Sequence, residues 1–461
     1  MYQIDFSKKI HIHFMGIGGI SMSGFAELLH SMGFTISGSD SQESKITQHL
    51  ESIGIQVTYG QNASNIHDGI DLIVYTAAIS KDNEEYIAAV NAGIPMMDRA
   101  EMVGQVMTNY ESAIAVSGTH GKTTTTSMLS HIFLAGDLDP TISVGGILKA
   151  INGNLRIGKS DTFITEACEY TNSFLKFHPT IGIILNIEED HLDFFKDLND
   201  IRNSFQLFAK LLPAKDGLLV INGDIENYTA ITNNLNCNVI TYSIEKHSCN
   251  YSADNIFFDD LGKGEFDLLE DGIKIGHIKL NVLGKHNISN ALSVIAVARY
   301  LHIPMEIIQS GLLSFEGTDR RFEYKGEAGG VTIIDDYAHH PTEICATLES
   351  AKKYPHKTIW CVFQPHTYTR TRAFLNEFAQ SLCLADKIVL TKIYPAREKD
   401  PGDISSKDLQ RKLEELGKEV YYFEDFEEVE NFLLENCIPG DLLITMGAGN
   451  VVSIGEALLG Q

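Results

Sequence analysis

A chain of 461 residues is too long for a single hydrophobic core, and 44% hydrophobic with 21% charged residues is an ordinary composition for a globular protein. Its 36 Lys and Arg residues against 61 Asp and Glu give a net charge of −25, which argues against nucleic acid or an anionic membrane surface as the main partner. Any anionic substrate must therefore be bound by local groups of cationic side chains. The usual domain size predicts roughly two to four domains.

The seven cysteines are scattered and none belongs to a C-x-x-C pair, which fits a reducing compartment and speaks against a disulfide framework or a structural zinc site. The N-terminal stretch MYQIDFSKKIHIHFMGIGG lacks the apolar core of a signal peptide, and no later run is long enough to span a membrane. We therefore expect a cytoplasmic protein without a membrane partner.

The first predicted strand, residues 10–15, runs directly into the glycine-rich segment GIGGISMSG at residues 16–24. A helix follows, and a second strand at residues 34–37 ends in GSD at residues 38–40, where an acidic residue often holds a ribose hydroxyl. This pattern is typical of a Rossmann-like domain. Ser21 stands where the G-x-G-x-x-G fingerprint has its third glycine, so a tight strand-to-helix turn without a ligand explains the segment nearly as well.

The segment AIAVSGTHGKTTTT, residues 113–126, has the pattern of a phosphate-binding loop. Its apolar start predicts a buried parallel strand, Gly118 and Gly121 break that strand, and the chain continues as a helix. Backbone N–H groups and the dipole at the start of a helix attract an anion. Lys122 adds a positive charge for the terminal phosphates, and the hydroxyl of Thr123 suits a bound magnesium ion.

The match to the usual phosphate loop is incomplete. Val116 stands where G-x-x-x-x-G-K-[ST] has its first glycine, so the loop is a shortened GTHGKT form. A Gly-Lys-Thr triplet also occurs by chance in many loops. The strand before it and the helix after it favour phosphate binding.

The order of the remaining elements predicts two more α/β domains. Strands of the second domain are expected at residues 162–165, 181–185, 217–221 and 239–242, followed by a short antiparallel excursion between residues 256 and 282 and a helix at 287–301. After a hinge at residues 314–318, strands of the third domain are expected at 331–335, 358–363, 387–390 and 441–446. The first domain has further strands at 55–57, 71–75 and 94–97, and we expect domains at residues 1–109, 110–315 and 316–461.

Acidic residues follow two strands of the second domain, at the edge where ligands gather in an open α/β sheet. Glu166 follows one strand, and NIEEDHLD at residues 186–193 follows the next. We expect Glu166 and His191 to be metal ligands; magnesium prefers oxygen, so the histidine suits a second, less strict metal position. For Glu188 and Glu189 the favoured interpretation is a solvated acidic helix start.

Further polar segments follow strands or hinges later in the chain. HNISNA at residues 286–291 opens a helix, where capping by Asn287 is an alternative role. DRRF at 319–322, DDYAHHPTE at 335–343 and QPHTYTRTR at 364–372 combine arginines with carboxylates and imidazoles. Such a set suits a site where phosphate and carboxylate groups meet, although a single arginine pair is more often a surface ion pair.

Together these motifs, in this order, resemble those of the Mur ligase family over nearly the whole chain. The motifs that carry the resemblance are GIGGISMSG (16–24), GSD (38–40), GTHGKTTT (118–125), EACEYTNSF (166–174), NIEEDHLD (186–193), HNISNA (286–291), DRRF (319–322), DDYAHHPTE (335–343), FQPHTYTRTR (363–372), YPARE (394–398) and MGAGN (446–450). The resemblance implies an α/β protein of three domains: an N-terminal Rossmann-like domain that binds a UDP substrate, a central P-loop-type ATPase domain, and a C-terminal Rossmann-like domain that binds an amino acid.

The resemblance also implies an ATP-dependent carbon–nitrogen ligase of cytoplasmic peptidoglycan precursor synthesis. In this family the γ-phosphate of ATP passes to a substrate carboxylate, and an amine then attacks the acyl phosphate to form an amide. The implied cofactors are ATP and Mg²⁺, the implied substrates are UDP-N-acetylmuramate and L-alanine, and we expect a monomer or weak homodimer.

Three other functions are compatible with part of this sequence. The nearest is a sister ligase that adds a recycled murein tripeptide to the same UDP sugar, and the amino-acid pocket near residues 337–340 separates the two. A non-catalytic nucleotide-binding protein is disfavoured by the intact loop lysine and metal ligands. A dinucleotide dehydrogenase is suggested only by residues 16–21.

The family's motifs assign a role to individual residues of this sequence. The catalytic residues expected from the resemblance are Lys122, Glu166, His191, His340 and Arg370, with Thr123, Glu166 and His191 as metal ligands. The expected ATP-binding residues are Gly118, Thr119, Gly121, Lys122, Thr123, Thr124, His286, Asn290, Arg321 and Asp336. The expected UDP-substrate residues are Gly16, Gly18, Gly19, Ser21, Met22 and Asp40, and the expected amino-acid-binding residues are Tyr337, His339, His340 and Arg372.

Several positions depart from the family's pattern. Ser21 replaces a glycine, Cys168 and Tyr170 replace an aspartate and a serine, Thr367 stands where an arginine is common, and Gln61 stands where a histidine is common. The departures concern chiefly contacts to uridine and phosphate, and they leave the loop lysine and the two principal metal ligands intact.

Overall fold

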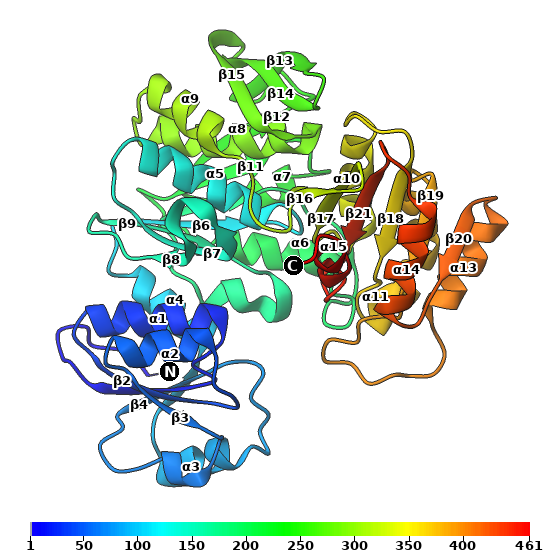
Figure 1. The fold of residues 1–461 in the computed structure, drawn as a ribbon. Coiled ribbons are helices and arrows are strands. Elements are labelled where there is room, and N and C mark those ends of the chain that lie inside the picture. Colours follow the sequence, from blue (N-terminus) through cyan, green and yellow to red (C-terminus); the bar gives the residue numbers. More distant parts are fainter. Residues whose placement is uncertain (1) are drawn as a thin grey trace.

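The computed structural model describes residues 2–461 and divides them among three β-sheets, each with helices on its faces (Figure 1). The N-terminal part, blue in Figure 1, and the yellow-to-red C-terminal part both adjoin the central cyan-to-green part. The prediction of an α/β protein with three domains is therefore confirmed. Within residues 2–461, none of the helices combines the length and the apolar character that crossing a membrane requires.

The N-terminal sheet is parallel and has the strand order β3-β2-β1-β4-β5. Its strands are β1 (His11–Met15), β2 (Thr35–Asp40), β3 (Gln56–Tyr59), β4 (Leu72–Tyr75) and β5 (Met96–Asp98). Its helices are α1 (Ile20–Ser31), α2 (Lys45–Ser52), the short η1 (Ala63–Asn65), α3 (Glu84–Ala92) and α4 (Arg99–Met107). The strand order reverses between β1 and β4, so the glycine-rich loop after β1 lies at the switch point where open α/β sheets bind ligands.

The central sheet has ten strands in the order β15-β14-β13-β12-β11-β10-β6-β9-β7-β8. The strands are β6 (Ser112–Ser117), β7 (Thr141–Leu148), β8 (Gly153–Arg156), β9 (Thr162–Glu166), β10 (Ile181–Ile184), β11 (Leu218–Asn222), β12 (Asn238–Ser243), β13 (Tyr251–Phe258), β14 (Lys263–Glu270) and β15 (Ile273–Leu283). The helices are α5 (Lys122–Ala135), η2 (Lys149–Ile151), η3 (Tyr170–Lys176), α6 (Leu198–Ala209), α7 (Thr229–Thr232), α8 (Lys285–Tyr300) and α9 (Met305–Ser314). The predicted antiparallel excursion is confirmed in β13 to β15, although it begins earlier than residue 256.

The C-terminal sheet has the order β16-β17-β21-β18-β19-β20, and only its first pair is antiparallel. The strands are β16 (Glu323–Ala328), β17 (Val331–Asp336), β18 (Ile359–Phe363), β19 (Lys387–Leu390), β20 (Glu419–Tyr422) and β21 (Leu442–Met446). The helices are α10 (Pro341–Ala351), α11 (Tyr368–Ala373), α12 (Leu375–Leu382), α13 (Ser406–Glu415), α14 (Phe426–Asn436) and α15 (Val452–Leu458). The carboxyl ends of β17 and β18 bring the segments after residues 336 and 363 to one edge of the sheet.

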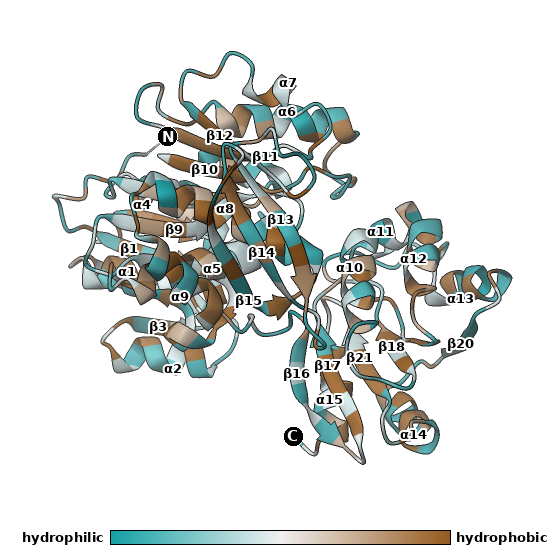
Figure 2. Cartoon of the chain, turned by 90° about the horizontal axis from the view of Figure 1, so that it is seen from above, coloured by the Kyte–Doolittle hydropathy of each residue, from teal (hydrophilic) through white to brown (hydrophobic). Residues whose placement is uncertain are grey.

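The N-terminal and central domains share a hydrophobic core, whereas the C-terminal domain has cores of its own. Inner strands such as β10, β11 and β21 are largely brown, hence hydrophobic, in Figure 2, whereas the edge strand β16 and the outer helices carry many hydrophilic residues. One cluster of buried side chains runs from the N-terminal domain into the central domain, where Phe25 of α1 and Tyr110 both contact Phe163 of β9. The two clusters of the C-terminal domain contain only residues of that domain. The interface of the C-terminal domain with the rest is therefore built without a shared apolar core.

The backbones of the N-terminal and central domains also approach each other closely. Gly104 on α4 lies so near η3 that a Cβ atom at this position would be 2.0 Å from the carbonyl oxygen of Lys176. Lys176 in turn pairs with Asp98 and Glu101 at the start of α4. Only glycine allows the helix to sit this close to the neighbouring chain.

Candidate active site

The phosphate-loop segment runs from the end of β6 to the first turn of α5. Gly118 has φ +144° and Gly121 has φ +83°, and a Cβ atom at either position would crowd Leu185 or Asn290. Glycine is therefore required here for both conformation and space. Asn186, which follows β10, fixes the loop, because its side-chain oxygen accepts the N–H of His120 at 2.7 Å. The loop is thus held open toward the edge where β6, β9 and β10 end.

Lys122 is bonded within the loop and to a carboxylate that the sequence did not single out. Its Nζ donates to the carbonyl oxygens of Gly118 (2.6 Å) and Thr119 (3.0 Å) and to Glu169 Oε2 (2.9 Å). Burial alone would lower the pKa of Lys122, but Glu169 outweighs this and raises it well above its ordinary value. Lys122 is therefore a fixed positive charge. Glu169 is the second glutamate of the EACE segment, which was its only signal in the sequence.

The expected metal ligands, Thr123, Glu166 and His191, lie near Lys122. Thr123 Oγ1 donates to Glu166 Oε2 at 3.1 Å, and the N–H of Gly145 donates to Glu166 Oε1 at 2.5 Å. Burial raises the pKa of the Glu166 carboxyl and lowers the pKa of His191. His191 faces Glu169 instead of Glu166, with Nε2 3.6 Å from Glu169 Oε1.

The chemistry of this group of side chains fits a divalent cation. Glu169 Oε1 is buried and has no hydrogen-bond donor within residues 2–461. Such an orphaned carboxylate oxygen is costly unless a cation or water meets it. A hydroxyl, two carboxylates and an imidazole together supply the oxygen-rich ligands that Mg²⁺ prefers, with one nitrogen in addition.

A cavity of about 260 Å³ lies between the central and C-terminal domains, next to the phosphate loop. Its walls contain several of the expected ATP-binding residues, which come from both domains: Gly121, Thr124, His286, Asn290, Arg321 and Asp336. Leu283 and Phe315 add apolar surface. Amides, an imidazole and apolar walls together suit a flat heteroaromatic base.

Two titratable groups of this cavity are shifted by burial. Burial, and then the nearby Arg321, lower the pKa of His286 to about 4, so its ring is neutral at pH 7. Burial raises the pKa of Asp336 to about 6. The Asp336 carboxylate accepts the N–H groups of Phe322 (2.8 Å) and Ala338 (2.7 Å), so it also shapes the two chain segments that carry the expected site residues.

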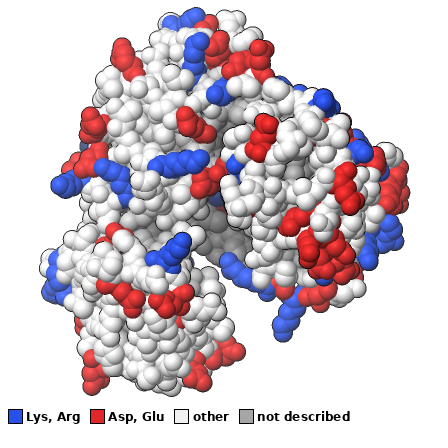
Figure 3. Space-filling model, in the orientation of Figure 1, with Lys and Arg blue, Asp and Glu red and all other residues white. Residues whose placement is uncertain are grey.

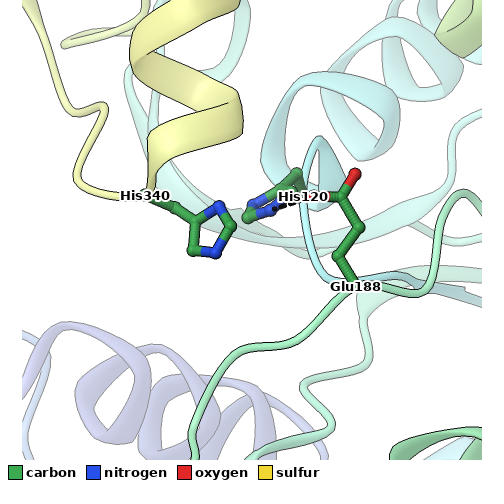
Figure 4. Close-up of side chains that lie close together, drawn as sticks. All are labelled: His120, Glu188 and His340. Carbon is green, nitrogen blue, oxygen red and sulfur yellow. Dashed lines mark ion pairs between the residues drawn. The ribbon is translucent and has the colours of Figure 1, made fainter. Parts of the chain in front are cut away.

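His120 lies between a carboxylate of the central domain, Glu188 (Figure 4), and a carboxylate of the C-terminal domain, Glu343. Its Nε2 is 3.5 Å from Glu188 Oε2, and its Nδ1 is 3.3 Å from Glu343 Oε1 on α10. Burial alone would lower the pKa of His120, but the two glutamates raise it to about 9. His120 is therefore an imidazolium that links the phosphate loop to the C-terminal domain.

The ligand atoms of His120, Glu188 and His340 lie within 4.8 Å of one another, as a metal site would require. The protonation of His120 and the bonds of His340 argue against one. His340 Nε2 donates to the carbonyl oxygen of Glu189 at 3.0 Å, and Nδ1 accepts the N–H of Thr342 at 3.3 Å, capping α10. Neither nitrogen of His340 has a free lone pair for a metal. The group is an ion cluster at the domain interface.

The expected amino-acid-binding residues do not all meet. The guanidinium carbons of Arg320 and Arg321 lie 4.9 and 5.3 Å from the ring centre of Tyr337. His339 lies beside it and its Nδ1 donates to the carbonyl oxygen of Tyr337 at 2.9 Å. Burial lowers the pKa of His339 to about 4, so the ring is neutral and Nε2 carries a lone pair.

Arg372 lines a second cavity, of about 390 Å³, together with Tyr170, His191, Arg370 and Arg397. The side chain of Arg372 is half exposed and pairs with Asp403. Arg370 is buried and its guanidinium is bonded to Asp190 and His366. Lys and Arg side chains also surround the hollow where the three domains meet (Figure 3). The protein thus offers local positive charge despite its acidic total.

The glycine-rich loop after β1 is braced by β2. The carbonyl oxygen of Ser39 accepts the N–H groups of Gly16 (2.8 Å) and Ile17 (2.9 Å). Asp40, expected to hold a ribose hydroxyl, uses one carboxylate oxygen to accept the N–H of Gly18 at 2.8 Å. Gly19 begins α1 as its N-cap. The loop is thus held in one conformation by backbone and carboxylate bonds.

Two other expected UDP-substrate residues are already in contact with the protein. The Ser21 hydroxyl accepts a hydrogen bond from Arg99 at 3.1 Å, and Met22 is buried in the core. A buried hydrogen-bond network around Glu85, which the sequence does not reveal, lies behind the loop. Ser39 Oγ donates to Glu85 Oε2 at 2.6 Å, and His13 Nε2 is 2.8 Å from Glu85 Oε1.

Comparison with known families covers almost the whole chain. The Mur ligase family, catalytic domain model matches residues 11–111, the Mur ligase middle domain model matches residues 116–298, and the Mur ligase, glutamate ligase domain model matches residues 320–449. Similar proteins include the UDP-N-acetylmuramate--L-alanine ligases of Lachnoclostridium phytofermentans, 58% identical, and Agathobacter rectalis, 59% identical, with all of both chains covered in each case.

Solved structures agree with this comparison. The UDP-N-acetylmuramate-alanine ligase of Thermotoga maritima superimposes with a TM-score of 0.81 at 29% identity, covering 98% of each chain. A murein peptide ligase of Psychrobacter arcticus shares the fold with a TM-score of 0.72 at 23% identity, again over 98% of each chain.

Proposed function

Because this chain belongs to the Mur ligase family, we propose that it joins L-alanine to the lactyl carboxylate of UDP-N-acetylmuramate in an ATP-dependent step of peptidoglycan precursor synthesis. The observation that carries the proposal is the placement of Lys122, Thr123 and Glu166 at one sheet edge, facing the C-terminal domain, in a chain of more than half identity to ligases of that name. The assignment of residues 1–109 to the UDP substrate, 110–315 to ATP and 316–461 to the amino acid is part of the proposal.

The first step transfers the γ-phosphoryl group of ATP to the lactyl carboxylate. The base of ATP would enter the cavity near His286, Asn290 and Asp336, and the triphosphate would extend along the loop at residues 118–124. Lys122 would exchange its bond with Glu169 for one with the phosphates. Thr123 and Glu166 would hold Mg²⁺ and His191 would serve a second metal position, and a cation bound there would neutralise charge on the transferring group.

The second step is attack by the amine of L-alanine on the acyl phosphate, which needs a neutral amine. His339 is proposed to accept a hydrogen bond from the amine at Nε2, because its ring is neutral and its Nδ1–H is fixed by the carbonyl oxygen of Tyr337. With a pKa of about 4 the ring is too weak a base to take the proton, which passes to water. Arg372 and Tyr337 are proposed to hold the carboxylate and the backbone of the amino acid. Phosphate leaves and the amide bond forms.

The UDP part is proposed to bind the loop at residues 16–22, whose N–H groups lie at the start of α1 with Asp40 beside them. We place the reaction in the cytoplasm, with the protein acting as a monomer or weak homodimer.

The test is phosphate release in the presence of ATP, Mg²⁺ and UDP-N-acetylmuramate, with L-alanine, glycine, L-serine and a murein tripeptide compared as acceptors. The highest kcat/KM is expected for L-alanine. A higher kcat/KM for the tripeptide would assign the chain to the sister activity instead. Release that does not depend on any acceptor would rule out both ligase activities.

A further inference from the structure

We propose that Arg370 is a positioning residue: it clamps Asp190 and thereby ties docking of the C-terminal domain to the orientation of His191. The proposal rests on the proposed function only in that His191 is taken as a metal ligand. It gives Arg370 a role different from the direct contact with phosphate or substrate carboxylate that the family resemblance implies.

Every nitrogen of the Arg370 guanidinium group has a partner within the protein. Nε and Nη2 donate to the same Asp190 oxygen, Oδ1, at 3.1 and 2.9 Å, and Nη1 donates to His366 Nδ1 at 3.0 Å. The two charged side chains are 8% and 7% exposed, so this ion pair is buried. To reach a substrate, the guanidinium would have to leave a buried carboxylate without a cation, which is strongly unfavourable.

Asp190 passes the contact on to its neighbour. The same Oδ1 atom accepts the backbone N–H of His191 at 2.8 Å. His191 has φ +54°, a left-handed conformation that is uncommon for a residue with a side chain. Such a conformation persists only where surrounding bonds hold it. One carboxylate oxygen therefore receives both the arginine of the C-terminal domain and the N–H group that sets the direction of His191.

The two residues before Asp190 also contact the C-terminal domain. Glu188 Oε2 accepts the hydroxyl of Thr342 at 2.6 Å, and the carbonyl oxygen of Glu189 accepts His340 Nε2–H at 3.0 Å. Residues 188–190 thus form a docking strip for the C-terminal domain, and the next residue faces the phosphate loop through Glu169. The helix start predicted for Glu188 and Glu189 is wrong, because residues 186–193 form no helix; the side chain of Glu189 is exposed as expected, whereas that of Glu188 is partly buried against Thr342.

Arg372, two residues further along α11, provides the contrast. It is 47% exposed, lines the second cavity and pairs with a surface carboxylate, Asp403. An anion can reach Arg372 without disturbing a buried pair. The geometry therefore points to Arg372 for contact with a substrate anion and to Arg370 for positioning.

The test is a double-mutant cycle with Arg370→Ala, Asp190→Asn and the double variant of the full chain. The first readout is Mn²⁺ affinity in the presence of ADP, followed by electron paramagnetic resonance. Each single variant should weaken Mn²⁺ binding about tenfold, and the double variant should be no weaker than the worse single variant, because both changes break one unit. The radius of gyration from small-angle X-ray scattering should rise in each single variant and no further in the double.

The opposite pattern would overturn the proposal. If Arg370 instead contacts substrate, Arg370→Ala will raise the KM of UDP-N-acetylmuramate or L-alanine and leave Mn²⁺ affinity unchanged. In the double variant, the effects of Arg370→Ala and Asp190→Asn will then multiply. Arg370→Lys keeps the charge and guards against a folding defect: it should restore part of the Mn²⁺ affinity. Mn²⁺ binding and scattering need no turnover, so a chain that failed to ligate L-alanine would still test the clamp.

A matched control is the ion pair of Arg202 and Glu226, which lies within the central domain and is largely exposed on the glutamate side. Arg202→Ala and Glu226→Gln should change neither Mn²⁺ affinity nor the radius of gyration. A comparable loss of Mn²⁺ affinity in this control pair would show that any broken ion pair has the same effect, and the clamp would be rejected.

Discussion

Lys122 of the phosphate loop forms an ion pair with Glu169, which follows β9, with 2.9 Å between Nζ and Oε2 and with side chains that are 16% and 3% exposed. The glutamate lies 47 residues further along the chain. The positive charge of the loop is therefore balanced before any nucleotide arrives, and a phosphate group must replace the carboxylate as partner of the lysine.

Replacing Lys122 by alanine should reduce kcat about a hundredfold, because one charged contact to the transferring phosphoryl group is lost. Phosphate release under saturating substrates measures this. Because this variant leaves Glu169 without its cationic partner, its thermal unfolding should also be recorded. The assay should be run well below the midpoint of that unfolding transition. Lys215→Ala, at an exposed lysine, is the control and should keep full activity. Near-normal turnover of Lys122→Ala would refute the assignment of the loop.

The imidazolium of His120 should make stability depend on pH. Its pKa is 6.5 ordinarily and about 9 in the folded protein, so its contribution is complete below pH 6.5 and is lost as the pH rises to about 9. This pKa shift corresponds to at most about 3 kcal/mol of folding free energy. Solvent screening makes the contribution smaller, because Glu188 is partly exposed. His120→Gln should lower the midpoint of thermal unfolding at pH 6.5 and reduce its fall between pH 6.5 and 9.5. His178→Gln, at an exposed site, should keep the wild-type profile.

Ser39→Ala should weaken binding of the UDP substrate alone. The substitution removes the hydroxyl that donates to the fully buried Glu85, a loss of about 1–3 kcal/mol. The carbonyl of residue 39 remains, but the loss of this bond disturbs the strand end whose carbonyl holds the glycine-rich loop. The KM for UDP-N-acetylmuramate should rise roughly tenfold. The KM values for ATP and L-alanine should stay unchanged. In the control Ser52→Ala, which changes an exposed serine on α2, all three KM values should stay unchanged. An equal rise in all three KM values would indicate a general folding defect and refute the prediction.

Glu166→Gln should impair the use of metal. The amide keeps one acceptor for Gly145 or Thr123 but loses the negative charge that a divalent cation needs. The Mg²⁺ concentration for half-maximal rate should rise at least about tenfold, and kcat should fall. A chelator should abolish the activity of the wild type. An unchanged Mg²⁺ requirement would show that Glu166 is not a ligand. Glu111→Gln changes an exposed carboxylate at the opposite, amino end of β6 and serves as the control.

The strands that the sequence predicts best are those buried on both faces. Strands β10 and β21 are continuous apolar runs bounded by turn residues, and they agree with the prediction to within about one residue. The missed strands include β8, β16 and β20, which lie at sheet edges. These three strands are partly exposed on both faces, so their residues carry no hydrophobic alternation that a pattern could detect.

The candidate site follows the same division between local and distant information. The phosphate loop is recognisable because strand, glycines, lysine and helix are contiguous in the chain. The roles of Glu169, Glu85 and Asp190 depend on partners 47, 46 and 180 residues away. No local pattern records such pairings. Arg370 belongs to a motif that the sequence reveals, but its partner can be identified only from the packing of two domains.

The two domain interfaces differ in kind, one apolar and one polar, and this difference should determine how the protein unfolds. The N-terminal and central domains share a buried apolar cluster and a backbone contact at Gly104, whereas polar and charged side chains such as Asp190 and Arg370 join the C-terminal domain to the rest. Cooperativity follows shared cores, so heating should melt the chain in two units, not three. Calorimetry would then show the first two domains as one transition, and a protease would release the C-terminal domain first.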